Sequence, residues 1–522
     1  MSIEIPSYPE LGQVYPGDYY QGIPIDEYID FQPVPEGDFV VDIRDYGAVS
    51  DGKTLCTEAF RQAAACLRTR GGGTLLVQDG SYITGSFSLP DYTTLFVAAD
   101  AEIRASRNAD DLLLGGEARH KGESFPGALL YVDHASHVRI TGGGRICGNG
   151  EWYVHEPKEK PLLQPHYVTK LPSWEEKAQI NSVPGSVRTL YRERIRYVDD
   201  RYGEGKAVLR RPSYMVWFDH CTDVEVDHIV LHDAMCWTLN LDTCDRVQIH
   251  DVVVDDNRHV SNTDGIDITG SSDVEIQHCF ISCADDGIVL KNPVHTARAM
   301  RNIHVSDCVI ITVMNALKIG TETVHPIEHV VMERCILQLN DIHPGSVSGI
   351  SIESCDGSWV QDVTVRDIQM DHVLCPIYLC LNKRNRTGDP YVDVPDENRY
   401  WGGGIEKIRI ENIQAVNAEM PCILTGFQTQ NLKGDMIRRA PYDVTLKNVN
   451  ITYRNNQEVI RLPKEVPEFL TDYPESNAHG DVDACGIWAR HIDKMCIENI
   501  QVIPRSCNTR DIIRLEDVRV RS

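Results

Sequence analysis

The chain has 522 residues with 77 acidic and 51 basic side chains, and its formal net charge of −26 predicts no nucleic-acid partner. Hydrophobic residues make up 42% and charged residues 25%, which excludes disordered and collagen-like chains and fits a fold with a large core. No run of 18 apolar residues occurs, so we expect no transmembrane helix and no membrane partner.

The first 38 residues hold six prolines and five tyrosines. This composition predicts an extended arm on the protein surface or on a partner subunit of a homo-oligomer, with a disordered tail as the alternative. Residues 1–43 contain no Lys or Arg and no apolar core segment, which does not fit a secretory signal. We therefore expect a cytoplasmic protein.

Residues 57–70 predict a helix that closes the N-terminal end of the fold, with an ordinary surface helix as the alternative. Thr57 is the expected N-cap, and the three glycines at 71–73 end the helix. The apolar face consists of Phe60, Ala63, Ala64 and Leu67.

Short copies of one pattern recur along the rest of the chain. Apolar and polar residues alternate, a polar residue such as Asp or Asn follows, and a second apolar pair ends the copy. Such self-similarity is typical of a solenoid of parallel strands whose turns share one core. We predict a single all-β domain over 39–522, although about 150 residues per domain would give three or four. The copies begin at Val224, Val247, Val274, Ile303, Val330, Val363, Ile408, Val444 and Met495.

Two segments interrupt the copies, at about 151–211 and 378–404, and we expect both to be insertions. The first has twelve basic against nine acidic residues. It could bring cations to an anionic ligand, or it could be a solvated loop whose charges pair internally.

Acidic residues cluster in two motifs, Asn262-Thr-Asp264-Gly and Ala-Asp285-Asp286-Gly. Asp264 and Asp285 are 21 residues apart, about one turn of the solenoid, so we expect the three carboxyl groups to meet on one edge. Carboxyl groups at such a short distance resist simultaneous ionisation, so one of them should keep its proton. A pair of one carboxylic acid and one carboxylate is what glycoside hydrolysis requires. The alternative is that these residues only cap turns.

Metals and cofactors are not expected. The acidic motifs could hold calcium, but the Asp-x-Asp-x-Asp loop is missing, and no phosphate-binding glycine loop or His-Glu-x-x-His spacing occurs. The seventeen cysteines form no Cys-x-x-Cys pair, which favours reduced, buried thiols over disulfides or zinc.

Several polar residues near the acidic motifs could bind an oligosaccharide substrate. Asn315 and Lys318 follow from the next turn of the solenoid, and a further group of cations follows a strand near residue 380. Solvated surface charge is the alternative for each cation. The candidates are Asn262, Lys291, Asn315, Lys318, Lys383, Arg384 and Arg386.

At these residues the sequence resembles glycoside hydrolase family 28, the polygalacturonase family of right-handed parallel β-helices. Residues 45–77 look like the family's N-terminal cap and first strand, and the two acidic motifs are similar to its Asn-Thr-Asp-Gly motif and paired aspartates. The resemblance spans about residues 39–510. It implies that Asp285 is the general acid, and that Asp264 and Asp286 position and deprotonate a water molecule in an inverting displacement.

The sequence departs from the family at two motifs. Asn315 stands about where the histidine of the Gly-His-Gly motif would be. The carboxylate-binding Arg-x-Lys motif aligns approximately with Tyr378 and Cys380. Residues 315–322 and 473–491 resemble a bacterial subgroup, which has an arginine where Cys380 stands.

We expect a glycosidase that cleaves galacturonide-type linkages in pectic oligosaccharides, with exo action because long insertions would wall off the site. Two alternatives stay open, a hydrolase of a neutral or rare-sugar glycoside and a non-catalytic carbohydrate-binding β-helix. A polysaccharide lyase fits less well, because this chain offers three acids. Trp152, Trp217 and Trp237 are candidates for packing against a sugar ring.

Overall fold

The structure is a computed structural model. It describes residues 19–114, 124–153, 211–338 apart from 259 and 261, 347–384, 403–430, 434–453, 466, 468–470, 473–476, 479, 482–504 and 510–521. The chain divides into two compact units. The first unit comprises residues 1–164 and 198–285, and the second comprises residues 165–197 and 286–522.

The first unit is built mainly from short strands. Its elements are α1 Ile25–Tyr28, β1 Val40–Asp42, η1 Ile43–Tyr46, β2 Asp51–Leu55, α2 Thr57–Arg70, β3 Gly73–Val77, β4 Gly80–Thr84, β5 Thr93–Val97, β6 Ala101–Ala105, η2 Ala109–Asp111, β7 Ser124–Asp133, β8 Ser136–Thr141, β9 Arg145–Cys147, η3 Gly150–Tyr153, β10 Arg211–Asp219, β11 Thr222–His232, β12 Trp237–Asp242, β13 Asp245–Asp255, β14 Ile266–Thr269, β15 Ser272–Gln277 and β16 Phe280–Cys283.

The second unit has the same character. Its elements are β17 Ile288–Asn292, η4 Val294–Thr296, β18 Met300–Ser306, β19 Val309–Thr312, β20 Asn315–Thr323, β21 Ile327–Glu333, β22 Ile336–Gln338, β23 Ser348–Ser354, β24 Trp359–Asp371, β25 Cys375–Leu381, β26 Gly404–Ala418, β27 Cys422–Thr425, β28 Phe427–Gln430, β29 Met436–Arg439, β30 Tyr442–Tyr453, β31 Ile487–Ile503 and β32 Ile513–Val520.

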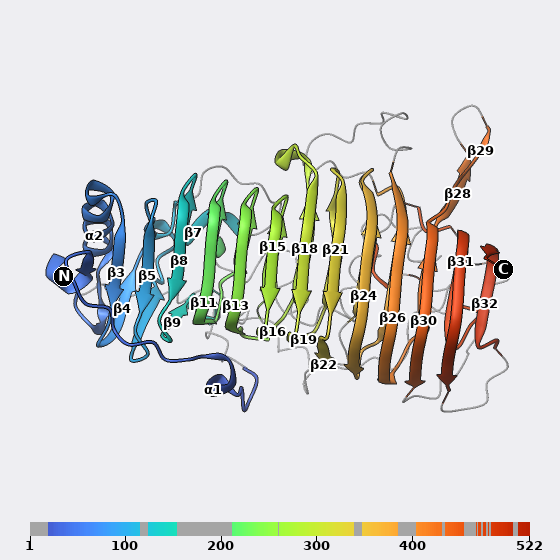
Figure 1. The fold of residues 1–522 in the computed structure, drawn as a ribbon, viewed down its shortest axis with the longest axis horizontal. Coiled ribbons are helices and arrows are strands. Elements are labelled where there is room, and N and C mark those ends of the chain that lie inside the picture. The colour runs from blue at the N-terminus through green and yellow to red at the C-terminus, as the bar shows by residue number, and fades with distance from the viewer. Residues whose placement is uncertain are drawn as a thin grey trace, which may run out of the picture. The chain divides into compact units, whose positions relative to one another are not determined.

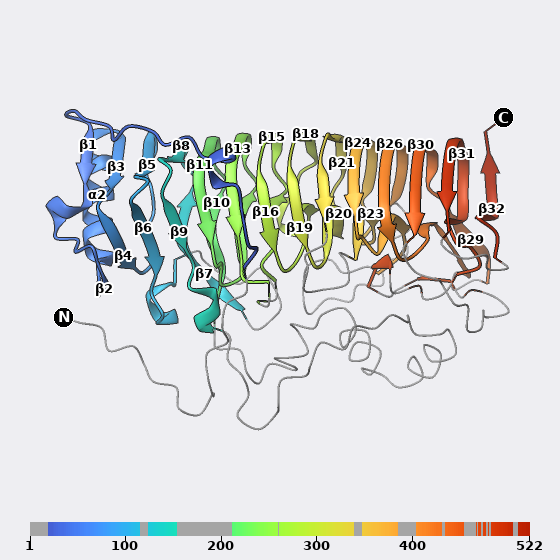
Figure 2. The ribbon, with the colours of Figure 1, turned by 90° about the horizontal axis from the view of Figure 1, so that it is seen from below.

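The strands of each unit pair in parallel, as the repeated pattern predicts. In the first unit Val224 on β11 pairs with Val247 on β13, which pairs with Val274 on β15 (Figure 1). In the second unit β18, β21, β24, β26 and β30 continue the series, and the first residues of their copies pair one to one from Ile303 to Val444 (Figure 2). The structure is therefore all-β with parallel strands, apart from the antiparallel β28–β29 hairpin.

Helix α2 buries the predicted apolar face, including Phe60 and Leu67, and ends at Gly71 in the left-handed conformation with φ of 84°. The expected N-cap is wrong by one residue. Cys56 occupies the cap position without a side-chain hydrogen bond, and Thr57 is the first helical residue. The Thr57 hydroxyl instead accepts a hydrogen bond from the Gly85 backbone at 2.7 Å, which ties the helix to the chain after β4.

The described part of the N-terminal arm lies on the first unit. The Tyr28 ring stacks on His278 with 4.7 Å between centroids, and Tyr28 and Ile29 are buried. The Asp30 backbone N–H donates to His228 Nδ1 at 3.2 Å. The arm thus packs on its own chain at these residues, and a partner subunit stays a prediction.

Asparagines at the turns stack in a ladder in the second unit. Asn412 donates to Asp367, Asn448 donates to Asn412, and Asn499 donates to Asn448, each at 2.8 Å. All four residues have φ between 52° and 57°, the left-handed conformation that Asn and Asp tolerate best after Gly. The Asp or Asn of the sequence pattern therefore marks the place where each strand bends.

Cysteines in the described part of the chain are free thiols, and all but Cys66 and Cys496 are buried, as expected. None of the helices in that part has the length and apolarity needed to cross a bilayer.

Replacing Asn448 by Ala should lower the free energy of unfolding by about 1–2 kcal/mol, because it removes two ladder hydrogen bonds and leaves an unsupported left-handed residue. Replacing Asn448 by Gly should cost less, since glycine adopts this φ without strain. Denaturant unfolding of the three proteins measures the difference. Equal losses in Ala and Gly variants would show that the conformation does not matter.

Candidate active site

Two predicted carboxylates meet in the first unit. Asp264 lies in the loop before β14, and its carbonyl accepts a hydrogen bond from Thr238 on β12 at 3.0 Å. Asp285 follows β16. Oxygen atoms of the two side chains lie within 4.8 Å, and both residues are buried, with 3% and 7% of their surface exposed. The predicted stacking of Asp264 and Asp285 is confirmed.

The loop that carries Asp264 is held by its own polar residues. The Thr263 hydroxyl donates to the Val260 carbonyl at 2.9 Å and accepts from the Ala284 backbone at 3.2 Å. Asn262 accepts from Arg211 Nη2 at 3.2 Å and reaches Asp285 Oδ2 through Nδ2 at 3.5 Å. Asn262 therefore lies where the sequence predicted, and contacts the carboxylate assigned as the general acid.

Asp286, the next residue along the chain, opens the second unit and is held by β20. Its Oδ1 accepts hydrogen bonds from Asn315, at 2.8 Å from the side-chain amide and 3.3 Å from the backbone. Its Oδ2 accepts from Lys318 Nζ at 2.9 Å. The predicted proximity of Asn315 and Lys318 to the paired aspartates is confirmed for Asp286, where both contact the carboxylate itself.

This arrangement keeps Asp286 ionised. Burial by itself would raise the pKa of Asp286, but the cations of Lys318 and Lys291 and the Asn315 amide outweigh it, so that pKa lies below its usual range. Burial would lower the pKa of Lys318, yet the attraction of Asp286 and Glu353 holds it well above its ordinary value. Asp286 is therefore a carboxylate suited to accept a proton.

Arg384 is engaged by a buried carboxylate. Its side chain is 2% exposed, forms an ion pair with Asp356 through Nη2 and Nε, and donates to the Thr321 carbonyl at 3.0 Å. That Arg384 holds an acidic sugar stays a prediction, and its Nη1 has no hydrogen-bond partner among the described residues. Lys383 is half-buried and its backbone donates to Leu470, whereas Arg386 lies outside the described residues.

The candidate tryptophans pack against protein. Trp217 is 1% exposed and lies beside Tyr214, with ring centroids 4.3 Å apart. Trp237 belongs to the same aromatic cluster. The Trp152 indole donates to the Arg107 carbonyl at 2.9 Å. Trp217 therefore belongs to the core, which excludes it as a sugar platform.

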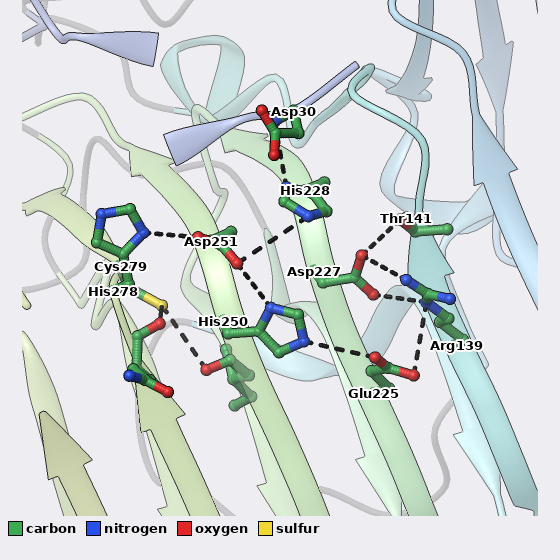
Figure 3. Close-up of polar contacts among 12 residues, drawn as sticks. Asp30, Arg139, Thr141, Glu225, Asp227, His228, His250, Asp251, His278 and Cys279 are labelled. Carbon is green, nitrogen blue, oxygen red and sulfur yellow. Dashed lines mark hydrogen bonds and ion pairs between the residues drawn. The ribbon is translucent and has the colours of Figure 1, made fainter. Parts of the chain in front are cut away.

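A second polar cluster in the first unit brings atoms of His228, His250 and Asp251 within 4.8 Å of one another (Figure 3). His228 Nδ1 accepts a hydrogen bond from the Asp30 backbone, so in the neutral ring Nε2 carries the proton and has no lone pair for a metal. Asp251 accepts from His250 at 2.8 Å and from His278 at 2.6 Å. This set is a hydrogen-bonded network under the arm, and its donors do not fit a metal.

A neighbouring set of possible metal ligands already binds a cationic side chain. The set consists of Glu225, Asp227 and His250. Arg139 binds both oxygens of Asp227 at 2.6 and 2.8 Å, and the Thr141 hydroxyl donates to Asp227 at 2.7 Å (Figure 3). A metal there would have to displace the guanidinium.

Comparison with known proteins shows which family this site resembles. Residues 199–394, which contain all three aspartates, match the family described as "Glycosyl hydrolases family 28". These residues are similar to glycoside hydrolase family 28. A probable polygalacturonase from Vitis vinifera is 23% identical to this chain over 421 residues, which are 77% of this chain and 74% of the relative.

Solved structures share the fold of this chain. An exopolygalacturonase from Thermotoga maritima superposes with a TM-score of 0.60 at 18% identity, and the match covers 92% of this chain and 94% of that one. A family 28 exopolygalacturonase from Yersinia enterocolitica gives 0.61 at 16% identity, over 92% of this chain and 78% of that one. The similarity to this family makes the protein a glycosidase.

Sequence reasoning missed two residues of the site. Arg211 is the last residue of the expected insertion at 151–211 and the first residue of β10, and no pattern there predicts its contact with Asn262. Glu353 is buried on β23, in Ile350-Ser-Ile-Glu353, where polar residues alternate with isoleucines. The sequence did hold a signal for Glu353, because polar residues occur on both of the paired strands β20 and β23, where Lys318 pairs with Ser351.

Replacing Lys318 by Met should destabilise the protein by about 3–5 kcal/mol, because it leaves the buried Asp286 carboxylate without its cation. The double variant Lys318→Met with Asp286→Asn should recover part of this loss, since both charges are then removed. Thermal and denaturant unfolding of the single and double variants measure the coupling. Additive losses would show that the two side chains do not interact.

Proposed function

We propose that this protein hydrolyses galacturonide-type linkages in pectic oligosaccharides. The observation that carries the proposal is the contrast between the aspartates. Asp286 is kept ionised by Lys318 and Asn315, whereas Asp285 has a carboxyl oxygen within 4.8 Å of one from Asp264, and two carboxyl groups at this distance resist simultaneous ionisation. Glycoside hydrolysis needs such a pair, one carboxylic acid and one carboxylate.

The proposed chemistry assigns each carboxyl group a step. Asp285 protonates the leaving oxygen of the glycosidic bond, while Asp264 and Asp286 position a water molecule and remove its proton as it attacks the anomeric carbon. Asn315 supports this role, because its buried Oδ1 has no hydrogen-bond partner among the described residues and could accept a bond from that water.

Inversion is proposed for the stereochemistry. Oxygens of Asp264 and Asp285 lie within 4.8 Å, which is shorter than the separation of about 6.5–9.5 Å usual between the two carboxyl groups of inverting enzymes. The spacing of this pair therefore does not support inversion, and the proposal rests on the family resemblance. The anomer of the product decides between inversion and retention.

The finer architecture and the exo action belong to the same proposal. The parallel strands would wind as a right-handed β-helix whose N-terminal end is covered by α2, since Phe60 and Leu67 of that helix are fully buried. The named exopolygalacturonases of similar fold support release of units from a chain end. The insertions at about 151–211 and 378–404 would limit access to the site.

A neutral or rare-sugar glycoside is the second candidate substrate. Lys318 is engaged by Asp286 and Arg384 by Asp356, so two of the cations proposed to grip a sugar carboxylate have other partners. Tyr378 and Cys380 are buried on β25, where the family's Arg-x-Lys motif aligns. Initial rates on galacturonides and on neutral aryl glycosides would separate the two substrates.

Asp285→Asn should lower the release of reducing sugar from oligogalacturonides by about 10²–10⁴-fold, the usual contribution of a general acid. The loss should be smaller with an activated aryl leaving group, which needs less protonation. Asp273→Asn, an exposed position on β15, is the matched control. Wild type and Asp285→Asn that are equally inert across a broad glycoside panel would favour a non-catalytic carbohydrate-binding protein.

A further inference from the structure

We propose that Glu353 is a positioning residue for Asp286. While Glu353 is protonated, Lys318 stays bound to Asp286. Once Glu353 ionises, its carboxylate draws Lys318 away from Asp286. The proposal rests on the proposed function, because it takes Asp286 as the group that activates water. It adds a residue outside the three aspartates and places an alkaline limit on the activity.

The register of two strands brings Glu353 to Lys318. Lys318 on β20 pairs with Ser351 on β23. Side chains two residues apart on a strand share a face, so Glu353 lies on the face of Ser351 and diagonally next to Lys318. Gly320 leaves the space, because a Cβ there would lie 2.8 Å from Glu353 Oε2.

Glu353 is buried with one oxygen unsatisfied. It is 0% exposed, and its Oε1 accepts a hydrogen bond from the Ser351 hydroxyl at 2.6 Å. Its Oε2 has no hydrogen-bond partner among the described residues. A buried carboxylate in this state is costly, whereas the neutral acid needs fewer partners. Burial accordingly raises the pKa of Glu353 to about 8, although Lys318 and Ser351 oppose the shift.

Lys318 lies among several acidic groups near Glu353. It donates to Asp286 Oδ2 at 2.9 Å, whereas Glu353 is uncharged at neutral pH because its pKa is raised to about 8. The Tyr473 ring lies 5.9 Å from Lys318 Nζ. The titratable groups that face Glu353 are Lys318 on β20, Asp286, Cys380 and Tyr378 on β25, Cys355, and Glu475 of the C-terminal segment.

Ionisation of Glu353 changes this balance. Above about pH 8 the Glu353 carboxylate also attracts the Lys318 ammonium, which weakens the hold of Lys318 on Asp286 Oδ2. Asn315 and the charge of Lys291 still act on Asp286, but its Oδ2 is then less firmly fixed beside the water it should activate. The site also gains a negative charge, which weakens the binding of an anionic substrate.

The test is the pH dependence of kcat/KM for wild type and Glu353→Gln. Wild type should lose about tenfold in kcat/KM per pH unit above about 8, as expected for one ionisation in the free enzyme. Glu353→Gln should lose this alkaline limb, so that its kcat/KM no longer falls above about pH 8. Ser351→Ala should shift the limb to higher pH, since it removes a hydrogen bond that favours the ionised form.

Asp256 is the matched control. It is a second buried acid, on the loop after β13, and burial raises its pKa to about 8 as well. Asp256→Asn should leave the alkaline limb in place. A limb that persists in Glu353→Gln and disappears in Asp256→Asn would overturn the proposal.

Protein stability gives a readout that needs no activity. The folded protein keeps the Glu353 proton up to about pH 8, whereas the unfolded chain loses it near its ordinary value of 4.5, so wild-type stability should fall with rising pH between these values relative to Glu353→Gln. Parallel pH profiles of the two unfolding midpoints would overturn the proposal. An inert wild type with diverging profiles would refute only the proposed function and uphold the ionisation of Glu353.

Discussion

In-register parallel pairing is the constraint on which the rest of the structure depends. Val224 pairs with Val247, and Ile303 with Val330, so each copy of the pattern lies directly beside the next copy in its unit. The turns that follow the strands are then stacked as well, as the 2.8 Å contact between Asn448 and Asn412 shows. Residues that are 20 to 50 positions apart in sequence become neighbours without any long-range folding signal.

The same constraint explains how charges are tolerated in the interior. A buried charged side chain must find its partner on a neighbouring strand or turn, because water is excluded there. Lys318 meets Asp286 in this way at 2.9 Å, and Arg384 meets Asp356. Glu353 stays protonated at neutral pH, since burial raises its pKa to about 8. The ionisation state of each of these buried acids therefore depends on whether a neighbouring strand or turn supplies a cation.

The repeated pattern predicted the register of the strands and the stacking of Asp264 on Asp285, because both follow from counting residues along one turn. It also predicted the buried face of α2, from Phe60 to Leu67. The pattern did not predict what Arg384 binds, since alternation gives the face of a residue and not its partner. The position of Arg211 could not be predicted either. The long segment before it does not follow the repeated pattern, so the number of residues per turn does not show that Arg211 lies beside Asn262.

We propose that the aspartates of this site hydrolyse a glycosidic bond with inversion. Proton NMR of oligogalacturonide digestion, recorded before mutarotation, measures both bond cleavage and the anomer of the newly formed reducing end. We expect this end to appear first in the configuration opposite to that of the cleaved linkage. A product that first appears with the configuration retained would contradict the inverting roles of Asp264, Asp285 and Asp286. No cleavage of either acidic or neutral glycosides would contradict the enzyme itself.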